Sequence, residues 1–311
     1  MEFFKEATHI DFLAARKVAI WFSVFLVVGT VASLGIRGMN YGIDFTGGTL
    51  VEMGYAAPVD LDDLRGKLEQ SEFEGAVVQY YGTAQDVLIR LGPQKDMNSV
   101  QISNRVIELI GAADKSTQVR RVEFVGAQVG EELVEKGGIA FIMSLFGILV
   151  YVAMRFQMKF AIGAIVALLH DPLVTIGFFS VTGMDFDLSV MAAILAIIGY
   201  SLNDTIVVFD RVRENFHRMR TATVVEVFNA SLNHTLSRTI VTGISTLLVL
   251  LALLFWGGKT IQGFTTALLI GLVVGTYSSV YVASPVCMAL GISRKDLMPV
   301  EKEGADLPDR S

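Results

Sequence analysis

The sequence is poor in cysteine and in charged residues. Its 311 residues include one cysteine, Cys287, so no intrachain disulfide can form. Charged residues make up 18% of the chain, below the roughly 25% of an average soluble domain. The stretch 37–136, which has ordinary charge density, contains neither histidine nor cysteine. This excludes the usual nucleophilic triads and soft metal sites from that stretch, and no cofactor or metal is expected.

Apolar residues are abundant and make up 52% of the chain. A hydrocarbon core of about 30 Å needs a helix of about 20 apolar residues. The chain is therefore predicted to be an α-helical membrane protein with six transmembrane helices, at 18–36, 137–154, 160–181, 188–209, 239–256 and 264–290. A cleaved signal peptide is an alternative for the first run. That run exceeds the core of about 7 to 15 residues of a signal peptide, which favours an uncleaved anchor.

Lysine and arginine near the span ends predict the orientation of the helices. They gather at positions that alternate spans place on one side of the membrane: Arg16, Lys17, Arg155, Lys159, Arg211, Arg213, Arg218, Arg220, Arg294 and Lys295. The short loops on the other side carry only Asp185, Asp187 and Lys259. Both termini are therefore expected in the cytoplasm. The cytoplasmic segments are 1–17, 210–238 and the tail 291–311.

The segment 210–238 is too polar to cross a membrane. Its apolar residues Val224, Phe228, Leu232 and Leu236 recur every four positions, which predicts an amphipathic helix along the cytoplasmic surface. Its arginines are interpreted as a topology signal, and no nucleic-acid partner is expected.

Residues 37–136 have the pattern of one small soluble domain. Strand-like stretches are "TLVEMGY", "AVVQYYG", "DVLIRL" and "TQVRRVEFVG", and helical spacing occurs in "VDLDDLRGKLEQSEF" and "SVQISNRVIELIGA". The order strand, helix, strand, strand, helix, strand predicts the ferredoxin-like α+β fold. The expected fold class is a six-helix membrane protein with this extracytoplasmic, periplasmic domain between helices 1 and 2.

The stretch "YGIDFTGGT" precedes the domain and contains Gly42, Asp44, Gly47 and Gly48. Paired glycines permit positive φ or a bulge where the chain enters the sheet. A phosphate-binding loop is the alternative, but no lysine and no following helix accompany the glycines. The stretch is therefore predicted to be a structural motif, with Asp44 stabilising a turn.

Asp204 lies deep in the fourth predicted span, where a charge is costly. Arg238 stands at the entrance of the fifth span, which runs antiparallel, so the two are expected at similar depth and able to pair. A carboxylate beside a guanidinium keeps its charge, whereas desolvation without that partner favours the protonated form. This pair is predicted to form a proton pathway, with Arg238 as counter-ion. An aspartate hydrated near the membrane surface is the alternative.

Further polar residues lie along the same helices. Tyr200 and Ser201 precede Asp204 by one turn, and Thr242, Ser245 and Thr246 follow Arg238. They predict a supporting polar stripe on each of the two helices.

The third span contains His170, Asp171 and Pro172 near its middle. Asp171 is a second candidate for the proton pathway. His170 either relays protons or makes a packing hydrogen bond. Pro172 removes a backbone donor and frees a carbonyl, which favours a hydrated path.

The sixth span carries small residues four apart at Gly271, Gly275, Ser279 and Ala283. Such a ridge lets another helix approach closely, so these residues are predicted to pack against a helix of this chain or of another subunit.

Several of these stretches together resemble the SecF family of the bacterial protein-export machinery. The matching stretches are "GIDFTGGT", "VEFVGAQVG", "ALLHDPLVTIGFFS", "IGYSLNDTIVVFDRVREN" and "LNHTLSRTIVTG", spread over nearly the whole chain. Where relatives have valine after the His-Asp pair, this chain has Pro172, which leaves the local helix geometry open.

The resemblance implies a multi-pass subunit of the resistance-nodulation-division (RND) superfamily in the bacterial inner membrane. It implies a complex with SecD that works with SecYEG, YajC and YidC. This complex would use the proton motive force to promote export or release of unfolded polypeptides after translocation through SecYEG. By the same resemblance, Asp204 and Arg238 belong to the proton pathway and the soluble domain moves or braces that of SecD. No enzyme activity is expected.

Two other functions remain open at this stage. A proton-coupled small-molecule efflux subunit of the RND type would be expected to have two large extracytoplasmic domains, whereas this chain has one small domain. A non-conducting scaffold of the translocon would hold Asp204 and Arg238 as a static pair.

Overall fold

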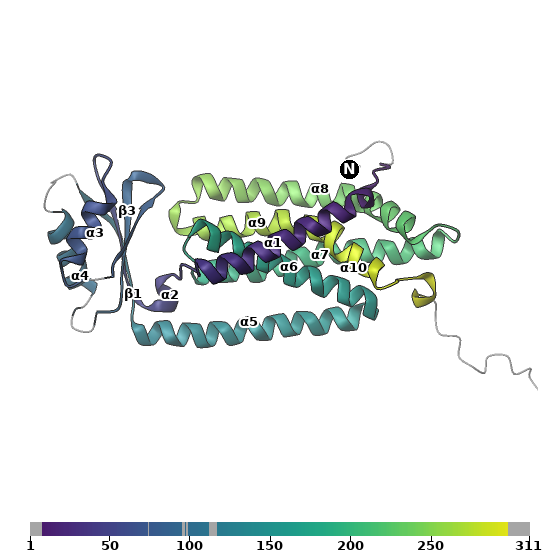
Figure 1. Ribbon diagram of the computed structural model, residues 1–311, viewed down its shortest axis with the longest axis horizontal. Helices are drawn as coiled ribbons and strands as arrows, with labels where there is room; N and C mark the ends of the chain where they lie inside the picture. Colours follow the sequence, from purple (N-terminus) through teal and green to yellow (C-terminus); the bar gives the residue numbers. More distant parts are fainter. Residues whose placement is uncertain (1–7, 74, 95–96, 98, 112–116, 298–311) are drawn as a thin grey trace, which may run out of the picture.

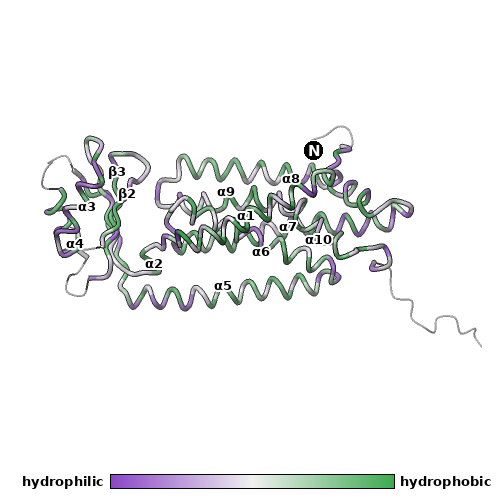
Figure 2. Tube along the Cα trace, in the orientation of Figure 1, coloured by the Kyte–Doolittle hydropathy of each residue, from purple (hydrophilic) through white to green (hydrophobic). Residues whose placement is uncertain are grey.

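The computed structural model describes residues 8–73, 75–94, 97, 99–111 and 117–297. Within this part of the chain, six helices are long and apolar enough to cross a membrane. They form an elongated bundle with a small sheet domain at one end (Figure 1). We call that end of the bundle the domain end and the opposite end the far end. Apolar residues run along the helices of the bundle, whereas the sheet domain and the far end mix polar and apolar residues (Figure 2). The predicted fold class is confirmed.

The bundle has three central and three outer helices. The central ones are α6 (Met158–Thr182), α7 (Leu188–Arg218) and α9 (Gln262–Ser278), which are the most buried. The outer ones are α1 (Arg16–Ile36), α5 (Ala127–Arg155) and α8 (Val224–Trp256), which expose most of their apolar side chains. Apolar exposure of this extent requires lipid or a protein partner around the bundle.

Short elements complete the bundle. The 3₁₀ helix η1 (Phe12–Ala15) precedes α1, and α2 (Ile43–Thr46) precedes the sheet. The 3₁₀ helix η3 (Lys259–Ile261) leads into α9, which continues through the π-helical turn η4 (Ser279–Ala283) into α10 (Ser284–Ala289). A last 3₁₀ turn, η5 (Arg294–Leu297), ends the described chain.

Two segments belong to long helices of the bundle, where the sequence predicted part of the soluble domain and a separate amphipathic helix. Residues 127–136, assigned to the soluble domain, already belong to α5. The segment 210–238 is not a separate surface helix, because its first part continues α7 and residues 224–238 begin α8. A capping box between Thr223 and Glu226 starts α8. Phe228 packs edge-on against Phe216 of α7, so the apolar repeat faces the neighbouring helix and not the membrane surface.

The soluble domain has the predicted order of elements: β1 (Gly48–Gly54), α3 (Leu61–Glu69), β2 (Val77–Tyr81), β3 (Thr83–Leu91), α4 (Ser99–Val106) with the π turn η2 (Ile107–Gly111), and β4 (Gln118–Val125). The strands lie in the order β2-β3-β1-β4, and every neighbouring pair is antiparallel. This is the ferredoxin-like arrangement. Its core joins the helices to one face of the sheet through Leu64, Leu68, Val87, Ile89, Ile102 and Val106. The other face is turned toward the bundle (Figure 1).

Candidate functional site

Asp171 is the fully buried centre of a polar cluster in the bundle, with 0% of its surface exposed. His170 Nδ1 lies 2.9 Å from Asp171 Oδ1. The other oxygen, Oδ2, accepts hydrogen bonds from Ser201 Oγ at 2.5 Å and Ser278 Oγ at 2.7 Å. These donors compensate a carboxylate that has lost all contact with solvent. We call His170, Asp171, Ser201 and Ser278 the Asp171 cluster; it ties α6, α7 and α9 together at one point.

Close packing of α7 against α9 brings the two serines to the same carboxylate. A Cβ added to Gly271 would lie 2.2 Å from Ile197 Cγ1, and one added to Gly275 would lie 3.0 Å from Ser201 Cβ. Only glycine allows these approaches, and α7 of this chain is the neighbour. Ser279 Oγ donates to the Gly275 carbonyl at 2.7 Å, so Ser279 bonds within its own helix.

The π turn follows directly after Ser278. It spans Ser279–Ala283 and is followed by Pro285, which has no N–H to donate to the preceding turn. A π turn adds one residue to the helical turn and redirects the side chains around it. In α6, the helix continues through Pro172, and the Thr175 hydroxyl donates to the Asp171 carbonyl at 2.9 Å.

His170 has a second buried nitrogen. Within the described chain, its Nε2 has no hydrogen-bond partner. The ring centre lies 6.4 Å from that of Tyr277, whose hydroxyl donates to the Ala19 carbonyl at 2.6 Å and lies 3.0 Å from Ser23 Oγ. His170 therefore faces the polar contact between α9 and α1.

Asp204 lies one turn beyond Ser201 on α7 and is 4% exposed. Its Oδ2 is buried and accepts no hydrogen bond from the described residues. The side chain lines a cavity of about 560 Å³, which we call the Asp204 cavity. Mostly apolar residues of α7, α8 and α9, together with Phe12 of η1, form its wall. An unpartnered carboxylate oxygen in such a wall is costly unless water or a proton reaches it.

The expected pair between Asp204 and Arg238 is not formed in this structure. Among the ion pairs of the described residues, none joins the two. Arg238 is exposed, although its charge still acts on Asp204 at longer range. The physical reason is that the Asp204 cavity lies between α7 and α8 at this depth.

The polar residues of α8 bond largely within their own helix. The Thr242 hydroxyl donates to the Arg238 carbonyl, and both Ser245 and Thr246 donate to the Thr242 carbonyl. The Tyr200 hydroxyl is directed toward this part of α8, since a Cβ added to Gly243 would lie 4.0 Å from it. Of the predicted α7 stripe, Tyr200 therefore faces α8, whereas Ser201 faces Asp171 on α6.

The glycine motif lies where the sheet domain meets the bundle. Gly47 and Gly48 have φ of +66° and +122°, and a Cβ on Gly48 would lie 2.2 Å from the Leu91 carbonyl oxygen. The Gly42 N–H donates to the Phe186 carbonyl at 2.8 Å. Asp44 Oδ2 accepts from the Leu188 N–H at 3.1 Å, so Asp44 satisfies a free N–H in the first turn of α7, whose N-cap is Asp187. Burial raises the pKa of Asp44.

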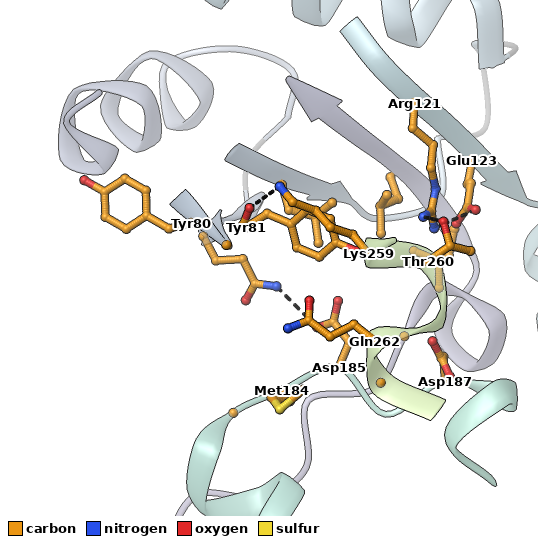
Figure 3. Close-up of a pocket in the computed structure, with 18 of the residues that line it drawn as sticks. Tyr80, Tyr81, Arg121, Glu123, Met184, Asp185, Asp187, Lys259, Thr260 and Gln262 are labelled. Atoms are coloured by element: carbon orange, nitrogen blue, oxygen red, sulfur yellow. Dashed lines mark hydrogen bonds and ion pairs between the residues drawn. The ribbon is translucent and has the colours of Figure 1, made fainter. Parts of the chain in front are cut away.

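A polar pocket of about 340 Å³ separates the sheet from the loops before α7 and α9. Figure 3 shows Lys259 reaching the Tyr81 carbonyl from one loop, and Asp185 lying in the other. Arg121 of β4 donates to the Thr260 hydroxyl at 2.8 Å. Within the described residues, no group of three or more histidine, cysteine or carboxylate side chains could hold a metal ion.

Sequence reasoning missed four of these residues. Ser278 stands beside Ser279, and only Ser279 continues the ridge of small residues spaced four apart. Tyr277 carried no signal other than its polar hydroxyl in an apolar span. Asp185 and Lys259 were interpreted only as markers of topology, although charged residues in very short loops of a membrane protein indicate a contact with a neighbouring domain.

Comparison with known proteins shows where this arrangement occurs. Residues 105–293 match the family model described as "Protein export membrane protein SecD/SecF, C-terminal", and residues 32–59 match "SecD/SecF GG Motif". The "Protein translocase subunit SecF" of Vibrio alginolyticus is 46% identical over 98% of this chain and 98% of its own length. That of Pseudomonas aeruginosa is 48% identical over 93% of this chain and 94% of its own.

Solved structures agree with the sequence comparison. The crystal structure of SecDF from Thermus thermophilus, described as a translocon-associated membrane protein, matches with a TM-score of 0.82 and 36% identity over 91% of this chain. A crystal structure of SecDF in a super-membrane-facing form matches with a TM-score of 0.69 at the same identity, over 93% of this chain. This chain spans 39% of each SecDF chain.

Proposed function

Because this chain belongs to the SecD/SecF protein export family, we propose that it uses the proton motive force, together with SecD, to promote protein export. Its relatives are named as translocase subunits, and it is a multi-pass protein of the inner membrane with six apolar helices. The proposed role is that of an accessory subunit that helps to move or release the exported chain on the outer side, after its passage through SecYEG.

The observation that carries this proposal is the buried Asp204 carboxylate with one unpartnered oxygen in the wall of a cavity. Such a group is more stable with a proton than without one, unless a cation approaches it. Arg238 is the candidate for that cation, since its charge already acts on Asp204. Closure of α8 onto the Asp204 cavity would bring the guanidinium to the carboxylate and release the proton. Arginine keeps its own proton throughout, so it acts as a counter-ion.

The Asp171 cluster gives the proton change a structural effect. Ser201, a member of the cluster, is one turn from Asp204 on α7. A movement of α7 on protonation of Asp204 therefore changes the hydrogen bonds of Asp171, and with them the contact between α7 and α9. His170 and Asp171 belong to the proposed pathway as the group that responds.

The proposed partners rest on the resemblance to the family, and the proposed orientation rests on the distribution of lysine and arginine along the chain. SecD is the proposed partner subunit, since this chain covers only 39% of the longer SecDF chain that it resembles. SecYEG, YajC and YidC are proposed as further members of the assembly, and an unfolded exported polypeptide is the proposed substrate. The proposed orientation has both termini in the cytoplasm and the sheet domain in the periplasm. The free apolar faces of α5 and α8 provide room for a partner subunit.

The energy available favours release or one-way movement over forced unfolding. One elementary charge crossing about 100 mV yields about 2.3 kcal/mol. Because about 1.4 kcal/mol changes an equilibrium tenfold, one proton suffices to shift a two-state equilibrium. Unfolding a stable domain costs about 5 to 15 kcal/mol, which exceeds this amount.

The test is the substitution Asp204→Asn in the complex with SecD. Export of a secreted protein is measured with and without a proton gradient, at equal abundance of the complex. Asp210→Asn is the matched control, because Asp210 lies on the same helix but pairs with Arg155 away from the cavity. We expect Asp204→Asn alone to abolish the gradient-dependent part of export. Unchanged export would indicate a scaffold, with coupling located elsewhere in the assembly.

A further inference from the structure

The face of the sheet that meets the bundle carries charged residues on β3. Val87 and Ile89 pack into the domain core with α3 and α4, and side chains alternate along a strand, so Asp86 and Arg90 lie on the opposite face. That face is turned toward the domain end of the bundle (Figure 1). The two charged residues are four positions apart, which is about 13 Å along a strand.

Lys259 holds the Asp86 end of β3. Its ammonium donates to Asp86 Oδ2 at 3.0 Å and to the Tyr81 carbonyl, and lies 3.9 Å from Glu52 Oε1. It also lies 4.5 Å from the centre of the Tyr81 ring (Figure 3). Asp86 and Glu52 are both buried, and the ammonium compensates these carboxylates together with Arg120, whose Nη1 lies 2.7 Å from Asp86 Oδ1. We call this the Lys259 contact.

Asp185 holds the Arg90 end of β3. Arg90 Nη2 pairs with Asp185 Oδ1, and Asn40 Nδ2 donates to the same oxygen at 2.7 Å. Arg90 Nη1 in turn donates to Asn40 Oδ1 at 2.7 Å. The side chains of Arg90 and Asp185 are 11% and 23% exposed, so salt screens this pair less than a surface pair. We call this the Asp185 contact.

Each contact is attached to the start of a helix that reaches the Asp171 cluster. Asp185 stands three residues before α7, which begins at Leu188. Lys259 stands three residues before α9, which begins at Gln262. Ser201 of α7 and Ser278 of α9 both donate to Asp171 Oδ2. One carboxylate therefore connects α7 to α9 inside the bundle, and one strand connects them again at the domain end.

We propose that Lys259 and Asp185 are positioning residues that make the sheet domain follow the relative movement of α9 and α7. This inference rests on the proposed function, because it assigns the residues through which a proton-driven change at Asp204 and Asp171 reaches the domain. The strand β3 is a suitable lever, since it is held at Asp86 by one helix and at Arg90 by the other. A common movement of both helices shifts the domain, whereas a movement of one against the other tilts it.

A small shift of α9 against α7 is sufficient to rotate the sheet domain. Helices move past each other by about 1 to 2 Å in many switching transitions. Across the roughly 13 Å between the two contacts, such a shift tilts β3 by roughly 4 to 9°. The backbone bonds that join Gly42 to Phe186 and Asn40 to Phe186 keep the entry of the domain fixed to the α7 side. Rotation therefore takes place about the α7 side, and the Lys259 side moves.

Distance measurement between two spin labels tests the inference. Labels are placed at Glu69→Cys on α3 and Ala252→Cys on α8, both exposed, in a Cys287→Ala background in the full chain with its SecD partner. The distance is measured in vesicles with and without a proton gradient. We expect a gradient-dependent change in the otherwise unsubstituted chain, and loss of that change in Lys259→Ala. Lys259→Arg should retain most of it.

Two further variants separate the inference from simple damage to the fold. Asp185→Ala breaks the second contact while Arg90 keeps Asn40 as a partner, so it provides the same test if Lys259→Ala lowers the amount of folded protein. Lys67→Ala is the matched control, because it removes an exposed ion pair with Asp63 in the same domain, away from the bundle. Gradient-dependent export should fall at least about fivefold in each contact variant, the lower end of typical coupling between sites, and stay unchanged in Lys67→Ala.

The outcomes distinguish this inference from the proposed function. If the contact variants keep the distance change, or the unsubstituted chain shows none, the inference is overturned. If the contact variants export normally while Asp204→Asn loses gradient-dependent export, the proposed function stands and the two contacts only attach the domain. If Asp204→Asn also shows normal gradient-dependent export, both the proposed function and the inference are contradicted.

Discussion

Ser201 on α7 donates a 2.5 Å hydrogen bond to Asp171 on α6, inside a bundle whose other interior contacts are mainly apolar. The same carboxylate oxygen accepts from Ser278 on α9 at 2.7 Å. Three helices thus share one buried acceptor, and a change in the charge or position of Asp171 affects all three. Asp204 is one turn from Ser201, so the group proposed to take up the proton is next to the group that joins the helices.

Removal of one donor to Asp171 should destabilise the bundle. Ser278→Ala leaves a buried carboxylate with one hydrogen bond fewer, which costs about 1 to 3 kcal/mol. Thermal unfolding of the purified protein in detergent should show a clear decrease in midpoint. Ser245→Ala is the control, since that hydroxyl bonds the carbonyl of its own helix and is exposed. Equal midpoints for the two variants would contradict the role given to Ser278.

A methyl group at Gly271 should separate α7 from α9. The added Cβ would lie 2.2 Å from Ile197 Cγ1, so Gly271→Ala forces the helices apart at a cost of about 1 to 3 kcal/mol. Gly138→Ala on α5 is the matched control, because none of the described atoms outside its own helix and chain neighbours lies within 4 Å of its added Cβ. There alanine should be neutral or slightly stabilising. Unfolding midpoints in detergent measure both, and a Gly271→Ala protein as stable as the control would contradict the close approach.

The Lys259 contact should persist over the physiological pH range. Burial alone raises the pKa of Asp86, but hydrogen bonds from Lys259 and Thr83 outweigh it and hold the pKa below the ordinary carboxyl value. A lowered pKa contributes stability that is present above about pH 4 and is lost as the pH falls below it. The difference in unfolding midpoint between the unsubstituted chain and Lys259→Ala should therefore be constant from pH 8 to about pH 5 and shrink below about pH 4. A difference that disappears between pH 8 and 6 would show that another group controls the contact.

The segment before α1 should detach when Asn233 is replaced. Asn233 accepts from the Ile10 N–H at 2.9 Å and donates to the Ile10 carbonyl at 2.8 Å, which holds this segment on α8. Asn233→Ala removes both bonds, so amide hydrogen exchange of residues 8–15 should accelerate about tenfold, as expected for a loss of about 1.4 kcal/mol. Asn104→Ala, an exposed asparagine of the soluble domain, serves as control. Unchanged exchange in Asn233→Ala would show that the buried Leu13 and the hydrogen bonds of Asn229 to Asp11 and to the Leu13 N–H hold the segment without Asn233.

Much of the architecture could be predicted from sequence because it depends on local patterns. Runs of about 20 apolar residues identified the six spans, and alternation with turn residues identified the ferredoxin-like order of the soluble domain. Where polar residues continue a transmembrane helix, hydropathy does not show the continuation. For this reason 127–136 was assigned to the soluble domain and 210–238 to a separate segment, whereas both belong to long helices of the bundle. Those segments are helical because they pack against neighbouring helices or are capped at their start.

The candidate site was predictable in its residues but not in its contacts. Asp171 and Asp204 stood out because a charge in an apolar span is costly. Depth along antiparallel helices placed Arg238 opposite Asp204, but depth does not show that a cavity separates them. Ser278 was missed because its role depends on how closely α9 packs against α6, which the sequence does not reveal. The contacts of Asp185 and Lys259 likewise depend on how the sheet is seated on the bundle.

Proton uptake by reconstituted vesicles tests the central claim most directly. Vesicles that contain the complex with SecD and a pH-sensitive dye inside are given a proton gradient while an exported polypeptide is supplied. The account predicts substrate-dependent acidification with the unsubstituted chain and with Asp210→Asn, and none above background with Asp204→Asn. Equal acidification with Asp204→Asn and the unsubstituted chain would contradict the account, because protons would then cross without the carboxylate of Asp204.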